Sequence, residues 1–480
     1  MLAHAKILLI RRPAFARVTL PAKPAKTMDP RIRELSEYAA GLSYDELPAA
    51  VVNECKRKLI DTLGCAIGAF EAEPARIARA VAAHYSSDTP ARIFGTLKKT
   101  SAEHAAFANG TMLRYADYND AYFNKNSGHP SDTFAGVLAL GESVHADGKA
   151  VILATTLAYE GFCNFSDILP REQGWDYVLF GVVGGALSAA KLLKLDAART
   201  AQAVALAVTP NLALEQTRMG ELSHWKGCAA ANAARNGIFA AILAEAGLTG
   251  PDDAIVGKAG LQHAVGPFEW APFGGRGGPF RVCETHLKFF PAVVHSQSPI
   301  AAAIELHGKV KPEDIEAIAV DSYWVANRYI NRASPLWQPG TRETADHSLP
   351  YIIAAAMIDG TISEHSFDED RLRDPRIAAL MKRMTLREKP EFTQLHPVKW
   401  PCVIEVTKKG GDTVSASVEY FKGHAKNPLS DAEVEHKFRA LAGDRLAAGQ
   451  ADRIIDTVWK LDTLPDVAQL IDLMAFKGMA

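Results

Sequence analysis

The sequence predicts a mainly α-helical protein that also contains a compact α+β region. Three observations support this prediction. From residue 31 to about 248, apolar residues and alanines recur at three- and four-residue spacing with short breaks at Gly, Pro or Asn, which is typical of successive amphipathic helices. After a glycine-rich run at residues 273–280, segments of alternating apolar and polar residues occur. Helical periodicity then resumes after residue 430 and continues to the end of the chain.

The helical half is rich in alanine, and residues 54–70 are typical of its segments. Pro130 suits the first turn of a helix that runs to about Val144. A further helix is expected at residues 227–246. Because alanine at many positions lets helix axes approach closely, we expect a packed helical domain rather than extended arms.

The region after the glycine-rich run is expected to contain both helices and strands. The polar segment KKGGD at residues 408–412 lies between two alternating segments, which is a β-hairpin signal. The whole region is therefore expected to form a compact α+β domain. Strands are expected at residues 315–323, 402–407 and 413–420, and helices at residues 298–306 and 348–357.

The last helical segment follows the sequence KNPLS at residues 426–430. Ser430 can cap this segment together with Glu433 three residues later. The pattern alone leaves open whether this tail rejoins the first domain.

Length and composition indicate a globular enzyme and exclude several other classes of protein. A chain of 480 residues suggests two or three domains, and a net charge of -2 argues against a nucleic-acid partner. The longest apolar stretch, residues 178–190, is shorter than the roughly 18 residues of a membrane helix. Six scattered cysteines without a Cys-x-x-Cys pair fit neither a disulfide framework nor a zinc or iron–sulfur site.

Residues 1–28 form an N-terminal extension that is basic and contains no acidic residue. It resembles either an organellar presequence, which would place the protein in the mitochondrial matrix, or a start upstream of the natural one. The scarcity of serine, the prolines that interrupt any amphipathic helix and the pair Met28-Asp29 favour the second interpretation. We therefore expect a cytoplasmic protein.

The most polar island in the helical half comprises the sequences LRYADYND at residues 113–120 and GHPSD at residues 128–132. Pro130 places His129 near a helix N-cap, where free backbone N–H groups favour a carboxylate ligand. The same helix dipole disfavours imidazolium, so His129 can be neutral near pH 7 and act as a base. Taken alone, His129 is more simply explained as a cap, and Asp117 and Asp120 as caps or solvated turns.

Two further residues are candidates for binding or proton transfer. Lys226 opens the helix at residues 227–246, where a cation opposes the helix dipole, so an anion should lie beside it. A lysine at the protein surface is an equally good explanation. His295 lies in the apolar sequence KFFPAVVHSQ at residues 288–297, which taken alone favours a buried structural histidine.

The polar run TRETADHSLP at residues 341–350 precedes an apolar helix and can be a cap network without a catalytic part. Other enzyme templates are absent from the sequence: there is no dinucleotide-binding glycine motif after a strand, Walker lysine motif, His-Glu-x-x-His or Gly-x-Ser-x-Gly. Nucleotide-binding, zinc-protease and hydrolase functions therefore have no support.

Taken together, these motifs resemble the MmgE/PrpD family, which includes 2-methylcitrate dehydratases, cis-aconitate decarboxylases and an iminodisuccinate epimerase. Each motif is short, but their order over much of the chain is specific. The segments that carry the resemblance are residues 59–65, 117–120, 128–132, 224–227, 288–292 with His295, 341–350 and the pair Asn427-Pro428.

The resemblance implies a large all-helical domain built from both ends of the chain, a smaller inserted α+β lid domain, a site in the cleft between them and a homodimer. On this basis we expect the helical domain at residues 29–282 and 425–480 and the lid domain at residues 283–424. The resemblance implies no metal or other cofactor, and the small-molecule partner is a tri- or dicarboxylate.

The resemblance also implies site residues. The catalytic positions are Asp117, His129, Lys226 and His295. We further expect the substrate to be bound by Asp120, Tyr177, Arg218 and Lys288.

Three departures from the family pattern bear on which substrate the protein uses. Tyr177 stands where many relatives have His, Ala121 where relatives often have Thr, and Val293 where they have Glu.

The implied reaction is metal-independent dehydration of 2-methylcitrate or a similar tricarboxylate. Removing a C–H proton next to a carboxylate needs a base, an acid for the departing hydroxyl and cations for the developing charge. We assign these roles to His129 oriented by Asp117, to His295, and to Lys226 with the helix N-termini. The alternatives are a cis-aconitate decarboxylase or an iminodisuccinate-type epimerase on the same fold, and a non-catalytic helical binding protein.

Overall fold

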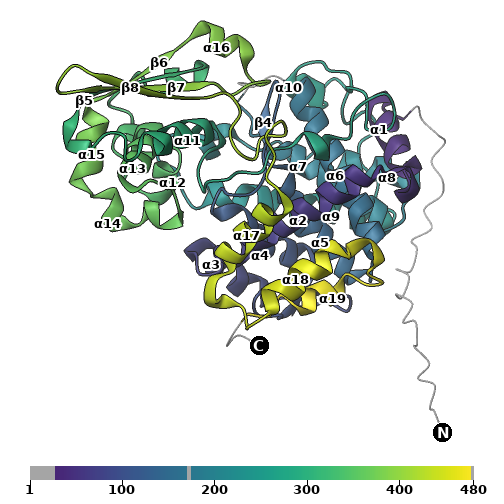
Figure 1. Ribbon diagram of the computed structural model, residues 1–480. Coiled ribbons are helices and arrows are strands. Elements are labelled where there is room, and N and C mark those ends of the chain that lie inside the picture. Colours follow the sequence, from purple (N-terminus) through teal and green to yellow (C-terminus); the bar gives the residue numbers. More distant parts are fainter. Residues whose placement is uncertain (1–27, 170–173, 477–480) are drawn as a thin grey trace.

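The computed structural model describes residues 28–169 and 174–476, and its two largest hydrophobic cores are separate. One core gathers residues between 32 and 287 together with residues 429–476, and the second gathers Ala121 and residues between 292 and 421. The N-terminal extension expected at residues 1–28 lies outside the described residues except for Met28. The mainly helical class and the smaller α+β region are confirmed (Figure 1).

The first core is built almost entirely from helices. Its N-terminal part also contains two very short hairpins, β1–β2 (Ala91–Arg92 with Lys99–Thr100) and β3–β4 (Tyr122–Phe123 with Ser127–Gly128). The helices of this part are α1 (Pro30–Gly41), α2 (Ala49–Gly68), α3 (Glu73–Ala82), α4 (Ala102–Tyr115), α5 (Phe134–Ser143), α6 (Gly148–Ile168), α7 (Val178–Leu192), α8 (Ala197–Val208), α9 (Trp225–Glu245) and α10 (Leu261–Val265).

Small residues bring these helices into close contact, as the alanine-rich sequence predicts. A Cβ atom added to Gly237 of α9 would lie 2.5 Å from the carbonyl oxygen of Val182 on α7. A Cβ atom on Gly184 of α7 would lie 2.6 Å from the carbonyl oxygen of Ala158 on α6. Larger side chains at these positions would therefore force the helix backbones apart.

The second core lies between a four-stranded sheet and the helices that cover it. The strands β5 (Ile315–Ser322), β6 (Met384–Glu388), β7 (Cys402–Lys408) and β8 (Thr413–Val418) pair in the order β6-β5-β7-β8. Only β5 and β6 are parallel. The helices of this part are α11 (Gln297–Leu306), α12 (Arg342–Ala345), α13 (Leu349–Asp359), α14 (Glu369–Leu372), α15 (Pro375–Lys382) and α16 (Pro390–Leu395).

The β7–β8 hairpin confirms the sequence prediction, since Thr407 pairs with Thr413 and Gly411 takes a φ of 87° in the turn. Strand β6 was not predicted. It has only five residues and pairs in parallel with β5, so its partner is remote in sequence and no local turn signal marks it.

The C-terminal segment returns to the helical core. Its helices are α17 (Asp431–Ala442), α18 (Gln450–Trp459) and α19 (Ala468–Asp472), drawn in yellow in Figure 1. Helices α17 and α18 pack against α2, and α19 packs against α5. The predicted cap is present, because Ser430 Oγ accepts a hydrogen bond from the Glu433 N–H at 3.2 Å. The C-terminal tail therefore rejoins the first domain, which the sequence pattern alone left open.

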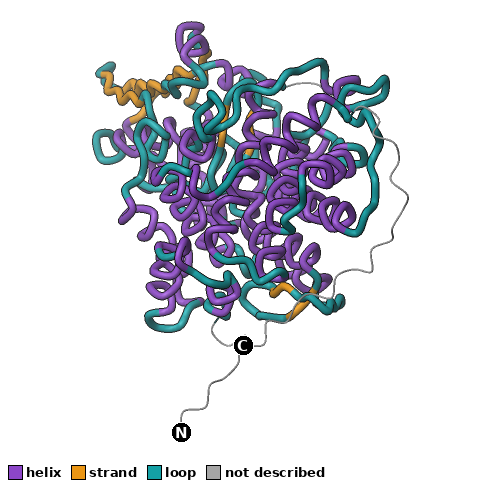
Figure 2. The backbone as a smooth tube through the Cα atoms, turned by 90° about the vertical axis from the view of Figure 1, so that its right-hand side faces the viewer, coloured by secondary structure: helices purple, strands orange, loops and turns teal. Residues whose placement is uncertain are grey.

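Figure 2 shows that most of the strand residues gather at one end of the molecule, whereas helices fill the remainder. None of the helices in the described ranges combines the length and hydrophobicity that a membrane span requires.

Candidate active site

Asp117 is the centre of a buried ionic cluster. Helix α4 ends at Tyr115, and Asp117 follows in a left-handed conformation with φ of 50°, which turns its carboxylate back toward the domain interior. Its Oδ1 lies 2.6 Å from Arg114 Nη1 and 2.6 Å from Lys288 Nζ. Its Oδ2 lies 3.2 Å from Lys226 Nζ. Burial alone would raise the pKa of Asp117, but these three cations hold it well below its usual value.

His129 presents one ring nitrogen to the site as a hydrogen-bond acceptor. Its Nδ1 lies 2.6 Å from the carbonyl oxygen of Asp120. A carbonyl only accepts hydrogen bonds, so Nδ1 carries the proton and Nε2 carries a lone pair. Burial and the nearby cations Arg114 and Lys288 hold the pKa of His129 well below 6.5. The ring is therefore neutral at pH 7 and can accept a proton at Nε2.

This geometry corrects two expectations about His129. The ring is oriented by the Asp120 carbonyl, whereas Asp117 Oδ1 lies 3.6 Å from the other ring nitrogen, Nε2. The expected helix begins with a 3₁₀ turn at Pro130–Thr133, and α5 starts only at Phe134. Burial is the largest cause of the low pKa of His129.

Asp120 supports His129 rather than lining the cavity. Its Oδ1 accepts a hydrogen bond from the Ser131 N–H at 3.0 Å, and its Oδ2 accepts one from Tyr159 Oη at 2.8 Å. The carboxyl group at the helix start is therefore a side chain of the protein itself. The substrate carboxylate that we expected at this N–H group would have to displace Asp120.

Lys226 has the anionic partners that its position predicts. It lies in the first turn of α9, where its Nζ is 3.2 Å from Asp117 Oδ2 and 3.8 Å from Asp346 Oδ1. Its side chain is 2% exposed, which rules out the surface explanation.

A second imidazole meets Asp117 from the α+β domain. His347 Nε2 lies 3.3 Å from Asp117 Oδ2, and His347 Nδ1 bonds to the carboxylate of Asp346. Asp346 ends α12, and Ser348 caps α13, so the pair occupies the connection between two helices. Asp117 is thus flanked by one imidazole from each domain.

Tyr177 and Arg218 form another side of the site. The Arg218 guanidinium lies 4.9 Å from the centre of the Tyr177 ring, and its Nε donates to Asp176 at 3.1 Å. Within the described residues, Arg218 Nη2 is buried and has no hydrogen-bond partner. Burial raises the pKa of Tyr177, so its hydroxyl stays protonated.

His295 lies in an aromatic setting at the edge of the site. Its Nδ1 lies 2.6 Å from Tyr323 Oη. The rings of Phe123, Trp324 and Trp400 have their centres within 5.5 Å of the imidazole centre. These contacts hold the ring on the α+β side of the site.

A cavity of about 100 Å³ connects these groups, and both domains contribute to its wall. It brings together six of the eight expected site residues, whereas Lys226 reaches the site through Asp117, and Asp120 through His129. The cavity is lined by Arg114, Asp117, Phe123, Ser127, Gly128, His129, Tyr177, Arg218, Leu222, Lys288, Val293, Val294, His295, Arg328 and His347.

The departures from the family pattern fall into two groups. Tyr177 and Val293 line the cavity, so they shape the space that a substrate occupies. Ala121 is fully buried in the second hydrophobic core instead, where its methyl group replaces a hydroxyl-bearing side chain away from the cavity wall.

Three residues could offer ligand atoms to a metal ion. Oxygen and nitrogen atoms of Asp117, Asp346 and His347 lie within 4.8 Å of one another. Lys226 Nζ contacts both carboxylates, and Lys288 Nζ lies 2.6 Å from Asp117 Oδ1. These ammonium groups already supply the positive charge that a metal would bring, so the donor set does not fit a metal ion.

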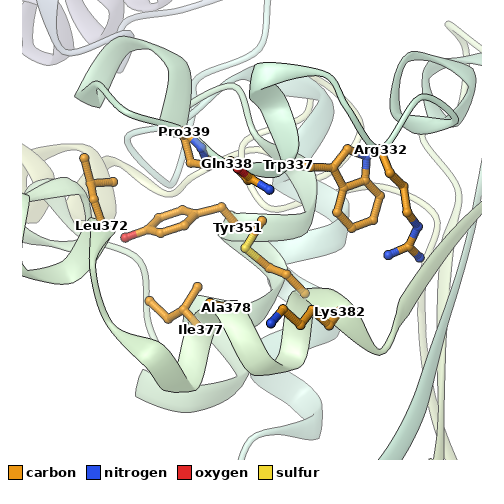
Figure 3. A pocket seen from close by; sticks show the side chains of 10 residues that line it. Arg332, Trp337, Gln338, Pro339, Tyr351, Leu372, Ile377, Ala378 and Lys382 are labelled. Carbon is orange, nitrogen blue, oxygen red and sulfur yellow. The ribbon is translucent and has the colours of Figure 1, made fainter.

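A second, separate cavity of about 440 Å³ lies within the α+β domain. Figure 3 shows the ring of Tyr351 reaching across it toward Leu372. Among the described residues, its wall contains Arg332 and Lys382 but no Asp, Glu or His. Arg332 donates to the carbonyl of Met384 and lies over the Trp337 ring. This cavity lacks the acid/base groups of the first one.

Arg114, Asp346 and His347 were not among the site residues expected from the sequence. Arg114 stands in the polar sequence at residues 113–120. The polar run at residues 341–350 does contain the caps that we expected, since Thr341 and Ser348 accept hydrogen bonds from backbone N–H groups. Between these caps, His347 contacts Asp117 directly, and Asp346 contacts His347 and Lys226. Only the tertiary structure reveals these contacts.

Comparisons with known proteins show which family the chain belongs to. The family profile of the MmgE/PrpD N-terminal domain matches residues 33–270, and that of the MmgE/PrpD C-terminal domain matches residues 290–463. Cis-aconitate decarboxylase of Homo sapiens is 28% identical over 464 residues, which cover 90% of this chain and 92% of the relative.

Two bacterial relatives carry a different name. 2-Methylcitrate dehydratase of Cupriavidus necator is 27% identical over 474 residues, 92% of this chain and 94% of the relative. The enzyme of that name from Escherichia coli K12 is 26% identical over 478 residues, 93% and 97% of the two chains. Both family profiles and enzymes of nearly the same length thus match along the chain, which belongs to the MmgE/PrpD family.

Proposed function

We propose that this enzyme removes water from 2-methylcitrate or a similar tricarboxylate by metal-independent acid/base elimination. One observation carries the proposal. Among the described residues, the cavity wall has four cationic side chains against the single carboxylate of Asp117, and it includes the neutral imidazole of His129. The four cations are Arg114, Arg218, Lys288 and Arg328.

The charge on the wall suits a substrate with several carboxylates. Arg218 Nη2 is buried and unpaired within the described residues, so a carboxylate would satisfy it. Lys288 and Arg114 already share one anion, Asp117, and their remaining charge favours a second one. Such fixed cations also stabilise the charge that develops on a carboxylate when the neighbouring C–H proton leaves.

His129 is the base in this scheme. Its Nε2 lone pair is held toward the cavity by the Nδ1 contact to Asp120, so it can remove the proton next to a substrate carboxylate. Lys226 and Lys288 hold Asp117 beside it. The positive charge is supplied by side chains, so no metal is needed to hold the substrate.

An apolar side of the cavity favours a methyl-bearing substrate. Phe123, Leu222, Val293 and Val294 form this side. One additional methyl group in an apolar pocket typically contributes about 1–3 kcal/mol to specificity. We therefore expect a higher kcat/KM for 2-methylcitrate than for citrate, by roughly tenfold or more.

Decarboxylation of cis-aconitate is the second candidate, because a relative with that name is 28% identical to this chain. It needs the same cations, and a proton donor at carbon in place of a base. The reaction product separates the two candidates, since dehydration yields an alkene and water, and decarboxylation releases carbon dioxide.

The test is incubation of purified protein with 2-methylcitrate, citrate, cis-aconitate and iminodisuccinate, with and without EDTA. Alkene absorbance, carbon dioxide and chirality are followed. The proposal predicts alkene formation from 2-methylcitrate that EDTA leaves unchanged. Carbon dioxide release from cis-aconitate, with no alkene formed from 2-methylcitrate, would favour decarboxylation. Racemisation of iminodisuccinate would favour the epimerase, and loss of turnover in EDTA would refute metal independence.

A further inference from the structure

The pair Asp346–His347 has the geometry of a second proton-transfer group. Asp117 Oδ2 lies 3.3 Å from His347 Nε2, and its Oδ1 lies 3.6 Å from His129 Nε2. Each imidazole therefore presents Nε2 to the same carboxylate, and both rings line the cavity. The His347 side chain is 22% exposed, so the site side of the ring is accessible.

The two imidazoles differ in what holds Nδ1. His129 Nδ1 donates to a neutral backbone carbonyl, whereas His347 Nδ1 donates to the carboxylate of Asp346. A carboxylate stabilises imidazolium far more than a carbonyl dipole does. His347 is therefore the better carrier of a proton, and His129 is the better acceptor of one.

The charged groups that face His347 act in both directions. Burial and Lys226 lower the pKa of His347 below its usual value, and Asp346 and Asp117 offset part of this shift. Burial would raise the pKa of Asp346, but Lys226 and His347 keep it below its usual value, so Asp346 stays ionised. A bound tricarboxylate adds negative charge to the same cavity, which favours the protonated form of His347.

We propose that His347 is the general acid that protonates the departing hydroxyl group, and that Asp346 is its positioning residue. This inference rests on the proposed dehydration. The C–H proton moves to His129 Nε2, and the C–H electron pair forms the C=C bond. The C–O bond breaks as its oxygen takes the proton from His347 Nε2, and water leaves. His129 ends with one proton more and His347 with one fewer, and exchange with solvent restores both.

This assignment moves the second proton transfer from His295 to His347. His295 Nδ1 is hydrogen-bonded to the neutral hydroxyl of Tyr323, whose pKa burial raises well above 10. The ring also lies among Phe123, Trp324 and Trp400. His347, in contrast, has the carboxylate of Asp346 at its Nδ1.

The experiment compares two leaving groups. One substrate is 2-methylcitrate, and the other is its analogue with chlorine in place of the hydroxyl group, because chloride leaves without a proton. His347→Asn should lower kcat for water elimination by roughly 10²–10⁴-fold, the usual contribution of a general acid. The same variant should eliminate chloride at close to the wild-type rate, which a merely structural role would not allow.

Two matched histidine variants complete the comparison. His129→Asn should lose both eliminations, because the base is needed in each. His365→Asn, which changes an exposed histidine outside the cavity, should retain both. Equal loss of both reactions in His347→Asn, or near-normal water elimination by it, would overturn the inference while leaving the dehydratase proposal in place. A wild-type enzyme that eliminates water from none of the tricarboxylates would remove the proposed function and the inference with it.

Discussion

At the scale of single residues, Asp117 combines backbone strain with strong electrostatic stabilisation. A left-handed conformation costs an L-residue roughly 1–2 kcal/mol, although Asp tolerates it better than most residues. Here that conformation brings the carboxylate among Arg114, Lys226 and Lys288. The resulting ion pairs are buried, so removing one partner would leave an uncompensated charge in the interior.

The pH dependence of kcat/KM follows from two shifted groups. Burial lowers the pKa of Lys288 to about 8, with Asp117 opposing the shift. Its ammonium is present below that pH and is lost above it, so substrate binding should weaken as pH rises through about 8. His129 must be unprotonated to act, and its pKa lies well below 6.5. We therefore expect kcat/KM to decrease on the acid side only at pH values below 6.5. A pH profile of kcat/KM for the chlorine analogue of 2-methylcitrate, whose elimination needs no protonated His347, measures both limbs.

Asp132 provides the control for this profile. Burial raises its pKa to about 7, but it bonds to Asn119 and does not line the cavity. Asp132→Asn should therefore leave the two limbs in place. A profile that still rises steeply between pH 6.5 and 7.5 in this variant would contradict the assignment of a neutral His129.

At the scale of elements, helix α17 connects the end of the chain to the active site. Lys437 Nζ lies 2.6 Å from Asp61 Oδ1 and donates to the carbonyl oxygens of Tyr118 at 2.7 Å and Lys288 at 2.8 Å. Tyr118 follows Asp117 directly, and Lys288 contacts it. The C-terminal helix thus fixes two backbone positions behind the site.

Lys437→Met should destabilise the protein and also disturb catalysis. Removing one partner of a buried ion pair typically costs about 3–5 kcal/mol, because the other charge is left uncompensated. Asp61 is fully buried, so this cost applies here. Urea unfolding measures the free energy, and kcat measures the effect on the site.

The double variant Lys437→Met/Asp61→Asn should recover part of the lost stability, since no buried charge remains. Lys422→Met is the matched surface control. Its ion pair with Glu433 is more than one third exposed on both sides, so its loss should cost no more than about 1 kcal/mol. Equal effects of Lys437→Met and Lys422→Met would argue against the role given to α17.

At the scale of the whole molecule, the α+β domain is inserted between two parts of one helical core. Residues 429–476 contribute to the same core as residues 32–287. Helix α17 covers Gly64 and Gly68 of α2, where added Cβ atoms would lie 3.1 Å from Phe438 Cα and Leu441 Cδ2. The two chain segments therefore form one packing unit.

A chain that ends at residue 428 should consequently fail to fold as a soluble monomer, because it exposes the apolar face of α2. Gel filtration and circular dichroism would detect aggregation and loss of helix. A separate fragment of residues 429–480, produced in the same cells, should restore soluble protein by covering α2 in trans. A truncated chain with native helix content and full stability would show that the C-terminal helices are dispensable.

The local elements of this protein were determined by the sequence. Helical periodicity predicted α9 and α13 to within two residues at each end, and the β7–β8 hairpin followed from its glycine-containing turn. These elements are specified by neighbouring residues, through side-chain spacing, caps and turn conformation. The family motifs likewise located Asp117, His129 and Lys226, which meet in the structure.

Only the tertiary structure decided which residues act together. Strand β6, the orientation of His129 by the Asp120 carbonyl, and the approach of Asp346 and His347 to Asp117 all join positions that local patterns cannot relate. The physical reason is that pKa values and tautomers depend on burial and on charges brought together by folding. The sequence by itself determined the local elements and the chemistry of the reactive side chains. The packing of two domains around Asp117 determined how these side chains are arranged for proton transfer.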